Sequence, residues 1–154
     1  MPLIRLISAS MVISFSLACA GDGISAPPIG FTHAVAGPVC GPAGGPAVGI
    51  YLARDPISGA PSTPYVRIYL AQSVTAISGW TWTLADGNAL FQSAPSTGPQ
   101  NYNNELATGG YMIVNSVGSD NTIEGTVDVT FPSAGHIRGG FRAAWLLPNV
   151  ELCQ

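Results

Sequence analysis

The chain has 154 residues, of which only 8% are charged; five arginines, no lysine and eight acidic residues give a formal net charge of −3. Phosphate binding needs clustered positive charge, so this balance argues against nucleic acid as a partner. Nineteen glycines and thirteen prolines argue against long helices, and the chain is long enough for one domain with a sizeable core.

The first residues predict an export signal. One positive charge precedes an apolar run from Leu6 to Ala18, which is short for a membrane span of about 20 residues. Two cleavage patterns overlap at its end: Ala18-Cys19-Ala20 fits an ordinary signal peptidase, whereas Leu17-Ala18-Cys19 fits lipidation at Cys19. We expect lipidation, because a Gly/Pro/Ser-rich tether follows. An uncleaved helix over 3–20 is a third interpretation.

These features divide the chain into three parts. Residues 1–20 are the expected signal, 21–46 a flexible Gly/Pro-rich tether and lead-in, and 47–154 a β domain. The predicted location is therefore periplasmic or elsewhere in the cell envelope, with a lipid anchor in a membrane.

The cysteines agree with export. If Cys19 is lipidated or removed, Cys40 and Cys153 remain in an oxidising compartment, and we expect them to form a disulfide. Closing so long a loop stabilises a fold by roughly 4–5 kcal/mol in the chain-entropy model. The alternative, metal ligation by Cys40 with His33 or His136, lacks the closely spaced ligands that a zinc site uses.

Five short segments with apolar or alternating character predict strands. They span 48–54, 65–72, 79–84, 89–92 and 111–115. The Gly/Pro/Ala-rich stretch before the first of them predicts a loop, and so does the polar stretch 93–106. Asp86-Gly87 between two alternating segments predicts that 79–84 and 89–92 form a hairpin.

The most regular stretch is 123–145, in which mostly apolar odd positions alternate with polar even ones. This is the pattern of an antiparallel hairpin, and apolar residues of both strands share a face only with a three- or five-residue loop. A three-residue loop sets Asp128 opposite Arg138 and Glu124 opposite Arg142. Each cross-strand ion pair is worth roughly 0.2–1 kcal/mol. About 13 Å along the strand, at ~3.3 Å per residue, separates the two acids, too far for a glycosidase pair.

Together the segments predict an all-β fold. With seven or eight short strands, turns about every ten residues and no substantial helix after the signal, we expect an antiparallel two-sheet sandwich.

Aromatic side chains supply the binding-surface candidates. Tyr65, Arg67 and Tyr69 lie on the outward side of their predicted strand, and both residue types are enriched at binding hot spots. The alternative is that a second sheet or the lead-in covers them. Trp80 and Trp82 share a face and belong by default to the core or its rim; a solvent-facing pair would indicate carbohydrate stacking or contact with a membrane-embedded partner. Tyr102 is a further candidate in the polar loop.

The segment Leu17-Ala18-Cys19 and the run from Gly125 to Ala143, which is followed by a closing cysteine, together resemble small uncharacterised bacterial lipoproteins with a β-sandwich domain. The resemblance covers about twenty residues of the domain. It implies placement at the surface or in the periplasm and no particular activity.

Catalysis is not expected. The chain has two histidines and lacks a Gly-x-Ser-x-Gly motif, a free nucleophilic cysteine and a histidine-rich metal cluster, so we predict no catalytic residue, cofactor or metal. Oxygen-rich stretches at 101–105 and 120–124 lack the acidic density of a dedicated calcium loop.

Two non-enzymatic functions remain. The first is an accessory subunit that binds and stabilises a membrane protein complex or another cell-envelope component. The second is a module that binds carbohydrate or another ligand. A sugar module should expose two or three coplanar aromatic rings, whereas a subunit should present a broad apolar patch or an unpaired sheet edge.

Overall fold

The computed structural model describes residues 30–41, 44–59, 61–84, 88–94 and 103–146. These residues form nine strands and a single 3₁₀ turn, η1, at Val74–Ala76. The strands are β1 His33–Cys40, β2 Pro46–Ala53, β3 Tyr65–Leu70, β4 Thr81–Thr83, β5 Ala89–Gln92, β6 Asn104–Leu106, β7 Gly109–Val117, β8 Ile123–Phe131 and β9 Gly135–Trp145. The prediction of an all-β fold is confirmed.

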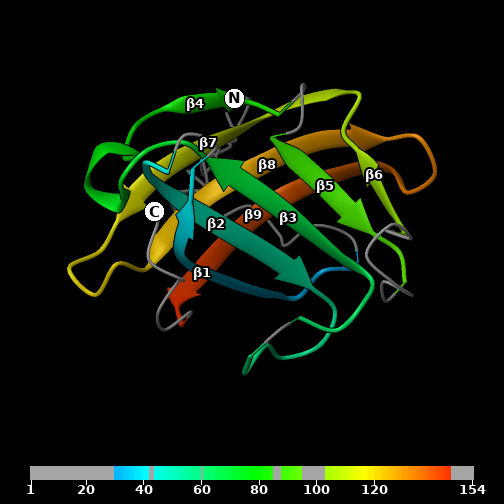
Figure 1. Ribbon diagram of the computed structural model, residues 1–154, viewed down its shortest axis with the longest axis horizontal. Coiled ribbons are helices and arrows are strands. Elements are labelled where there is room, and N and C mark those ends of the chain that lie inside the picture. The colour runs from blue at the N-terminus through cyan, green and yellow to red at the C-terminus, as the bar shows by residue number, and fades with distance from the viewer. Residues whose placement is uncertain (1–29, 42–43, 60, 85–87, 95–102, 147–154) are drawn as a thin grey trace, which may run out of the picture.

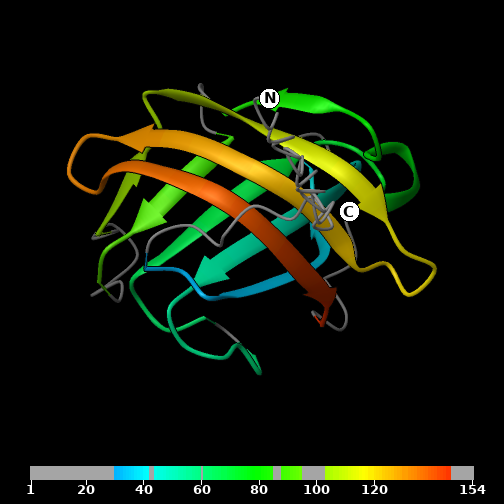
Figure 2. The same cartoon turned by 180° about the vertical axis from the view of Figure 1, so that it is seen from behind.

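All nine strands belong to one sheet in the order β4-β7-β8-β9-β1-β2-β3-β5-β6. The sheet curls so that a front half (β1, β2, β3, β5 and β6) lies over a back half (β4, β7, β8 and β9), as the two views show (Figures 1 and 2). The halves are joined where β1 pairs in parallel with β9, at Val35 with Ala144 and Ala36 with Trp145. The expected two antiparallel sheets of seven or eight strands are therefore replaced by one mixed, nine-stranded sheet.

The core lies between the two halves. The front half contributes the inward rows of β2 and β3, and the back half those of β7, β8 and β9, with Ile77 and Leu84 from the loops. Phe91 of β5 and Phe131 of β8 meet across this space, with ring centroids 5.8 Å apart. Because each strand alternates, the polar partners of these residues are left on the two outer faces of the curled sheet.

Strand β1 corrects the prediction that the stretch before residue 48 is loop. All eight residues of β1 pair with β2, from His33 opposite Ala53 to Cys40 opposite Pro46. Pro38 is tolerated because it lies beyond the short parallel pairing with β9, where its missing N–H removes no ladder bond. The sheet therefore begins before residue 47, and part of the expected lead-in belongs to the domain.

The predicted hairpin between 79–84 and 89–92 is wrong. Strand β4 pairs with β7 at one end of the sheet order, whereas β5 pairs with β3 and β6 at the other end. Trp82 lies opposite the fully buried Met112, so β4 covers the core from the back half. Asp-Gly is a local turn signal and does not determine which strands pair. The predicted polar loop also contains a short strand, β6.

The hairpin of β8 and β9 has the register that its alternation predicts. Phe131 pairs with Gly135 across a three-residue loop, and the pairing continues to Ile123 opposite Ala143. Gly135 has a φ of +74°, the left-handed conformation that such loops require and that glycine adopts without strain.

Glu105 of β6 fastens the front half to this hairpin. Its carboxylate accepts hydrogen bonds from Ser133 Oγ at 2.8 Å, Ser133 N at 2.9 Å and Ala134 N at 3.0 Å. Burial opposes ionisation of Glu105, but these hydrogen bonds outweigh it and lower the pKa of the carboxyl below its ordinary value. The negative charge of Glu105 thus stabilises the closure of the curled sheet.

Candidate functional site

The outer side of the front half carries a cluster that we call the tyrosine face. It consists of Tyr51, Tyr65, Arg67, Tyr69, Leu90 and Leu106, on strands β2, β3, β5 and β6. The inward residues of β3 are fully buried, so alternation directs Tyr65, Arg67 and Tyr69 outward. The register then aligns Tyr51, Arg67, Leu90 and Leu106 in one row across four strands. Figure 1 views the molecule from the side of these strands.

Hydrogen bonds anchor two of the tyrosines. Tyr65 Oη donates to Gln92 Oε1 on β5 at 2.5 Å, and Tyr69 Oη donates to the carbonyl oxygen of Cys40 on β1 at 3.0 Å. Tyr69 reaches β1 across β2, where its partner in the ladder is Gly49, and the side chains of Val39 and Tyr51 lie over that glycine. These hydrogen bonds therefore fix the positions of both rings in the free protein.

Burial raises the pKa of both anchored hydroxyls. The positive charge of Arg67 lowers the pKa of Tyr65 and Tyr69, but desolvation is the larger effect at each. Tyr51 adds to the rise at Tyr65, and their ring centroids lie 6.0 Å apart at 51°. Tyr65 and Tyr69 therefore remain neutral hydrogen-bond donors at neutral pH.

The tyrosine face is neither fully covered nor fully open. Val35, Ala53 and Ile57 form a small buried cluster against which Tyr51 and Tyr65 pack. Arg67 is exposed, the three tyrosines and Leu90 are partly exposed, and Leu106 is 54% exposed at the free edge β6. The expected cover by the lead-in is thus partial: β1 borders the tyrosines without hiding Arg67.

Arg67 differs from the other cations of the sheet. Among the described residues, no carboxylate forms an ion pair with it, whereas Arg138 and Arg142 each have one. Its neighbours in the row are Tyr51 on β2 and Leu90 on β5. Within the described residues, the centre of the tyrosine face is therefore a positive charge without a carboxylate partner, next to aromatic and apolar side chains.

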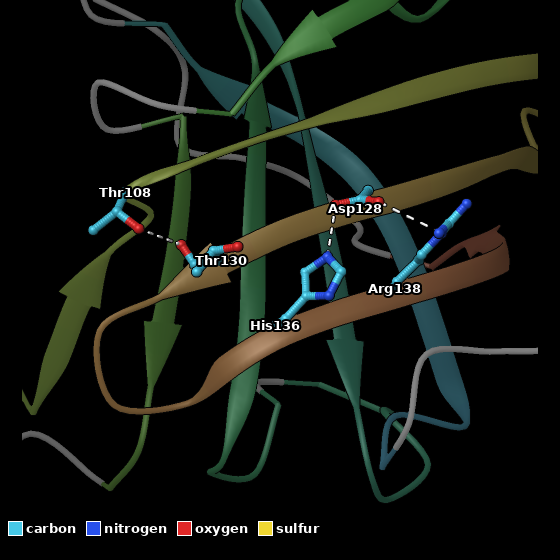
Figure 3. Close-up of polar contacts among 5 residues, drawn as sticks. All are labelled: Thr108, Asp128, Thr130, His136 and Arg138. Carbon is cyan, nitrogen blue, oxygen red and sulfur yellow. Dashed lines mark hydrogen bonds and ion pairs between the residues drawn. The ribbon is translucent and has the colours of Figure 1, made fainter.

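The outer side of the back half carries the charged face, which consists of Glu124, Asp128, His136, Arg138 and Arg142 on β8 and β9. Asp128 bridges two partners, with Oδ1 2.8 Å from His136 Nε2 and Oδ2 3.5 Å from Arg138 Nε (Figure 3). Glu124 Oε1 lies 3.5 Å from Arg142 Nη1. The structure thus contains both ion pairs that the predicted register implies, and each acid lies beside an arginine.

His136 and Asp128 have the geometry of an oriented histidine, as in a hydrolase. A nucleophile must also lie within hydrogen-bond reach of the imidazole. Among the described residues, Asp128 is the one hydrogen-bond partner of that ring. Nearby Thr108 instead donates its hydroxyl proton to the carbonyl oxygen of Thr130 at 3.2 Å (Figure 3). Within the described residues, the arrangement is therefore a surface contact between Asp128, His136 and Arg138 with no nucleophile hydrogen-bonded to the imidazole.

The tryptophans occupy the rim of the core at edge strand β4. Trp82 packs on the core, and Trp80 stacks on Trp82 with centroids 5.9 Å apart and 29° between the planes. Trp80 is 57% exposed, while Trp82 Nε1 is buried without a hydrogen-bond partner among the described residues. Since one ring covers the other, the pair presents one open aromatic surface rather than a platform of two.

Several predicted site residues lie outside the described part of the chain: Cys19, Cys153 and Tyr102. Lipidation and the disulfide from Cys40 therefore stay predictions. No group of three or more His, Cys, Asp or Glu residues comes together in the part that the structure describes. In the same part, no helix is long and apolar enough to cross a bilayer.

Sequence reasoning missed half of the tyrosine face. Tyr51, Leu90 and Leu106 are not distinctive within their own segments, and their position beside Arg67 depends on strand register. The outward position of Tyr51 between inward Ile50 and Leu52 was the available signal.

Comparison with known proteins gives no relative: the chain matches no protein-family model, no curated protein and no solved structure. Arguments about function therefore rest on the geometry of the chain.

Proposed function

We propose that this protein is a non-catalytic, exported domain, tethered to a membrane through Cys19, that serves as an accessory subunit of a larger cell-envelope protein complex. The observation that carries the proposal is the tyrosine face. Tyrosine and arginine dominate interaction hot spots, where anchored aromatic rings supply contact area at a low entropic cost.

The free edges of the sheet support the same function. The sheet order ends in β4 and β6, so in the part of the chain that the structure describes, one side of each has no neighbouring strand. Each has three residues, and short edges of this kind limit uncontrolled association. Exposed Leu106 lies on β6, where the tyrosine face meets the edge. A partner protein could therefore contact the face and the edge together.

A carbohydrate-binding function is the second candidate, and the open surface of Trp80 is the observation that favours it. A sugar ring stacks well on one exposed indole. The other exposed aromatic among the described residues, Tyr111, lies on the outer side of the back half, opposite Asp128, whereas Trp82 lies opposite inward Met112. Tyr111 and Trp80, which stacks on Trp82, therefore do not form one platform for a sugar.

The test is native co-purification of the full chain from its own membranes in mild detergent without reductant. Mass spectrometry then identifies the N-terminus and the accompanying proteins. We expect a lipidated Cys19 and migration with a stoichiometric assembly. Migration near the monomer mass would contradict an accessory subunit, and binding to a glycan array that Trp80→Ala abolishes would establish the second candidate instead.

A further inference from the structure

The charge at the centre of the tyrosine face indicates the chemistry of its partner. On the charged face, each of the two acids has an arginine within ion-pair distance. Arg67 has no such counter-charge in the described residues, and it lies between tyrosines whose pKa values respond to it. A cation in these surroundings is complemented by an anion, and a guanidinium matches the planar carboxylate geometrically.

The row that contains Arg67 distinguishes a protein from a sugar. Leu90 lies directly opposite Arg67, and Leu106 directly opposite Leu90, so two leucines continue the row to the free edge. Leucine side chains gain from apolar contact and offer no hydrogen bond to sugar hydroxyls. The combination of one cation, adjacent aromatic rings and two leucines therefore fits a peptide segment with both acidic and apolar side chains.

Strand geometry sets the spacing within that segment. Neighbouring strands lie about 4.8 Å apart, which places the backbones at Arg67 and Leu106, two strands apart, roughly 10 Å from each other. Three residues of a chain in the extended polyproline II conformation span about 9 Å at ~3.1 Å per residue, and because this conformation repeats every three residues, the first and fourth side chains point to the same side. An acidic residue over Arg67 would thus be accompanied by an apolar residue three positions away, over Leu106.

We propose that the tyrosine face binds a segment of a partner protein in the extended polyproline II conformation, in which an Asp or Glu pairs with Arg67 and an apolar residue three positions away covers Leu106. The anchored rings of Tyr65 and Tyr69 border the carboxylate, and Leu90 packs beneath the intervening residues. This inference rests on the proposed function and adds the chemistry of the partner.

Site-specific photo-crosslinking in intact membranes tests the inference. The full chain carries p-benzoylphenylalanine in place of Tyr51, which lies opposite Arg67, or in place of Tyr111 on the outer side of the back half as a matched control. We expect an adduct from position 51 and none from position 111. The crosslinked peptide should contain an acidic residue and an apolar residue with three-residue spacing.

Charge exchange then tests the role of Arg67. Arg67→Glu should reduce the adduct at least tenfold, and replacing the acidic residue of the partner by arginine should restore it. An adduct at 51 that persists in Arg67→Glu, or whose peptide has no acidic residue, overturns the inference and leaves the accessory function intact. A glycan adduct, or an adduct to a second copy of this chain, also overturns it.

The absence of adducts is informative when it is combined with co-migration. If the chain co-migrates with an assembly but position 51 gives no adduct, the partner binds elsewhere and the inference is wrong. If no adduct forms and the chain migrates alone, both the inference and the proposed function are wrong.

Discussion

The two outer faces of the curled sheet arise from the same strand alternation, but they differ in whether their charged side chains form ion pairs. On the charged face, Glu124 and Asp128 lie opposite Arg142 and Arg138, and His136 adds a second partner for Asp128. On the tyrosine face, Arg67 lies between Tyr51 and Leu90 with no described carboxylate beside it. The comparison shows that the same strand alternation can pair charges on one face and, within the described residues, leave a cation without a carboxylate on the other, which is why our proposal places the partner on the tyrosine face.

Both faces depend on the same core, so a cavity there should disrupt them together. Phe131 is 1% exposed and contacts Phe91 from the opposite half. We expect Phe131→Ala to lower the free energy of unfolding by about 3–5 kcal/mol, because it removes a large buried ring between the halves. Urea denaturation measures the change. A loss below about 1 kcal/mol would show that the halves do not share this core.

Substitution of Leu106 separates an effect on partner binding from an effect on the stability of the fold. Its side chain is 54% exposed on the tyrosine face, and Leu146, 53% exposed after β9, is a matched control. Leu106→Asp should weaken partner binding about tenfold or more, because it places a charge in an apolar contact. Leu146→Asp should leave binding unchanged. Equal losses in quantitative pull-downs would mean that surface apolarity in general, and not this face, determines binding.

Glu105→Gln tests the fastening of the front half to the back half. Because the substitution removes charge-assisted hydrogen bonds at a solvent-accessible site, we expect it to lower the free energy of unfolding by about 1–2 kcal/mol. The carboxyl has a folded-state pKa below its unfolded value. Its contribution is therefore present above the unfolded pKa and lost as pH falls through the folded pKa.

Urea titrations of both proteins at a series of pH values check this linkage. The difference between wild type and Glu105→Gln should be largest near neutral pH and should shrink as the solution becomes acidic. A difference that is constant with pH would contradict a role for the carboxylate charge.

The smallest effect is expected on the charged face itself. Asp128→Asn weakens contacts with His136 and Arg138 but leaves both side chains exposed to water. We expect a loss of less than about 1 kcal/mol, further reduced in high salt, because exposed ion pairs are weak and screened. Thermal unfolding at low and high salt measures it. A loss of several kcal/mol would show that this ion pair supports the fold.

The sequence predicts local features of the fold better than its strand partners. The register of β8 and β9 follows from alternation and loop parity, which are contained within one stretch of chain. Strand β1 was missed because its glycine, alanine and proline residues give little strand signal, while pairing with both β2 and β9 stabilises it. The hairpin expected at Asp86-Gly87 did not form because β4 pairs with β7, whereas β5 pairs with β3 and β6.

In the candidate site, too, the sequence predicts local features but not which strands lie side by side. The outward direction of Tyr65, Arg67 and Tyr69 follows from period-two alternation in β3 alone. What surrounds Arg67 depends on the order β2-β3-β5-β6, in which β5 and β6 are separated from β3 by β4 in the chain. Non-local register cannot be read from one sequence, so the row that ends at Leu106 appears only in the structure.

The most direct test of the account is a matched charge reversal on the two faces. Arg67→Glu and Arg138→Glu change the net charge equally, and both side chains are exposed on the outer faces of the sheet. In blue-native electrophoresis of solubilised membranes, we predict that Arg67→Glu releases the chain from its assembly while Arg138→Glu remains bound. Retention of Arg67→Glu together with release of Arg138→Glu would contradict the account and move the binding surface to the charged face.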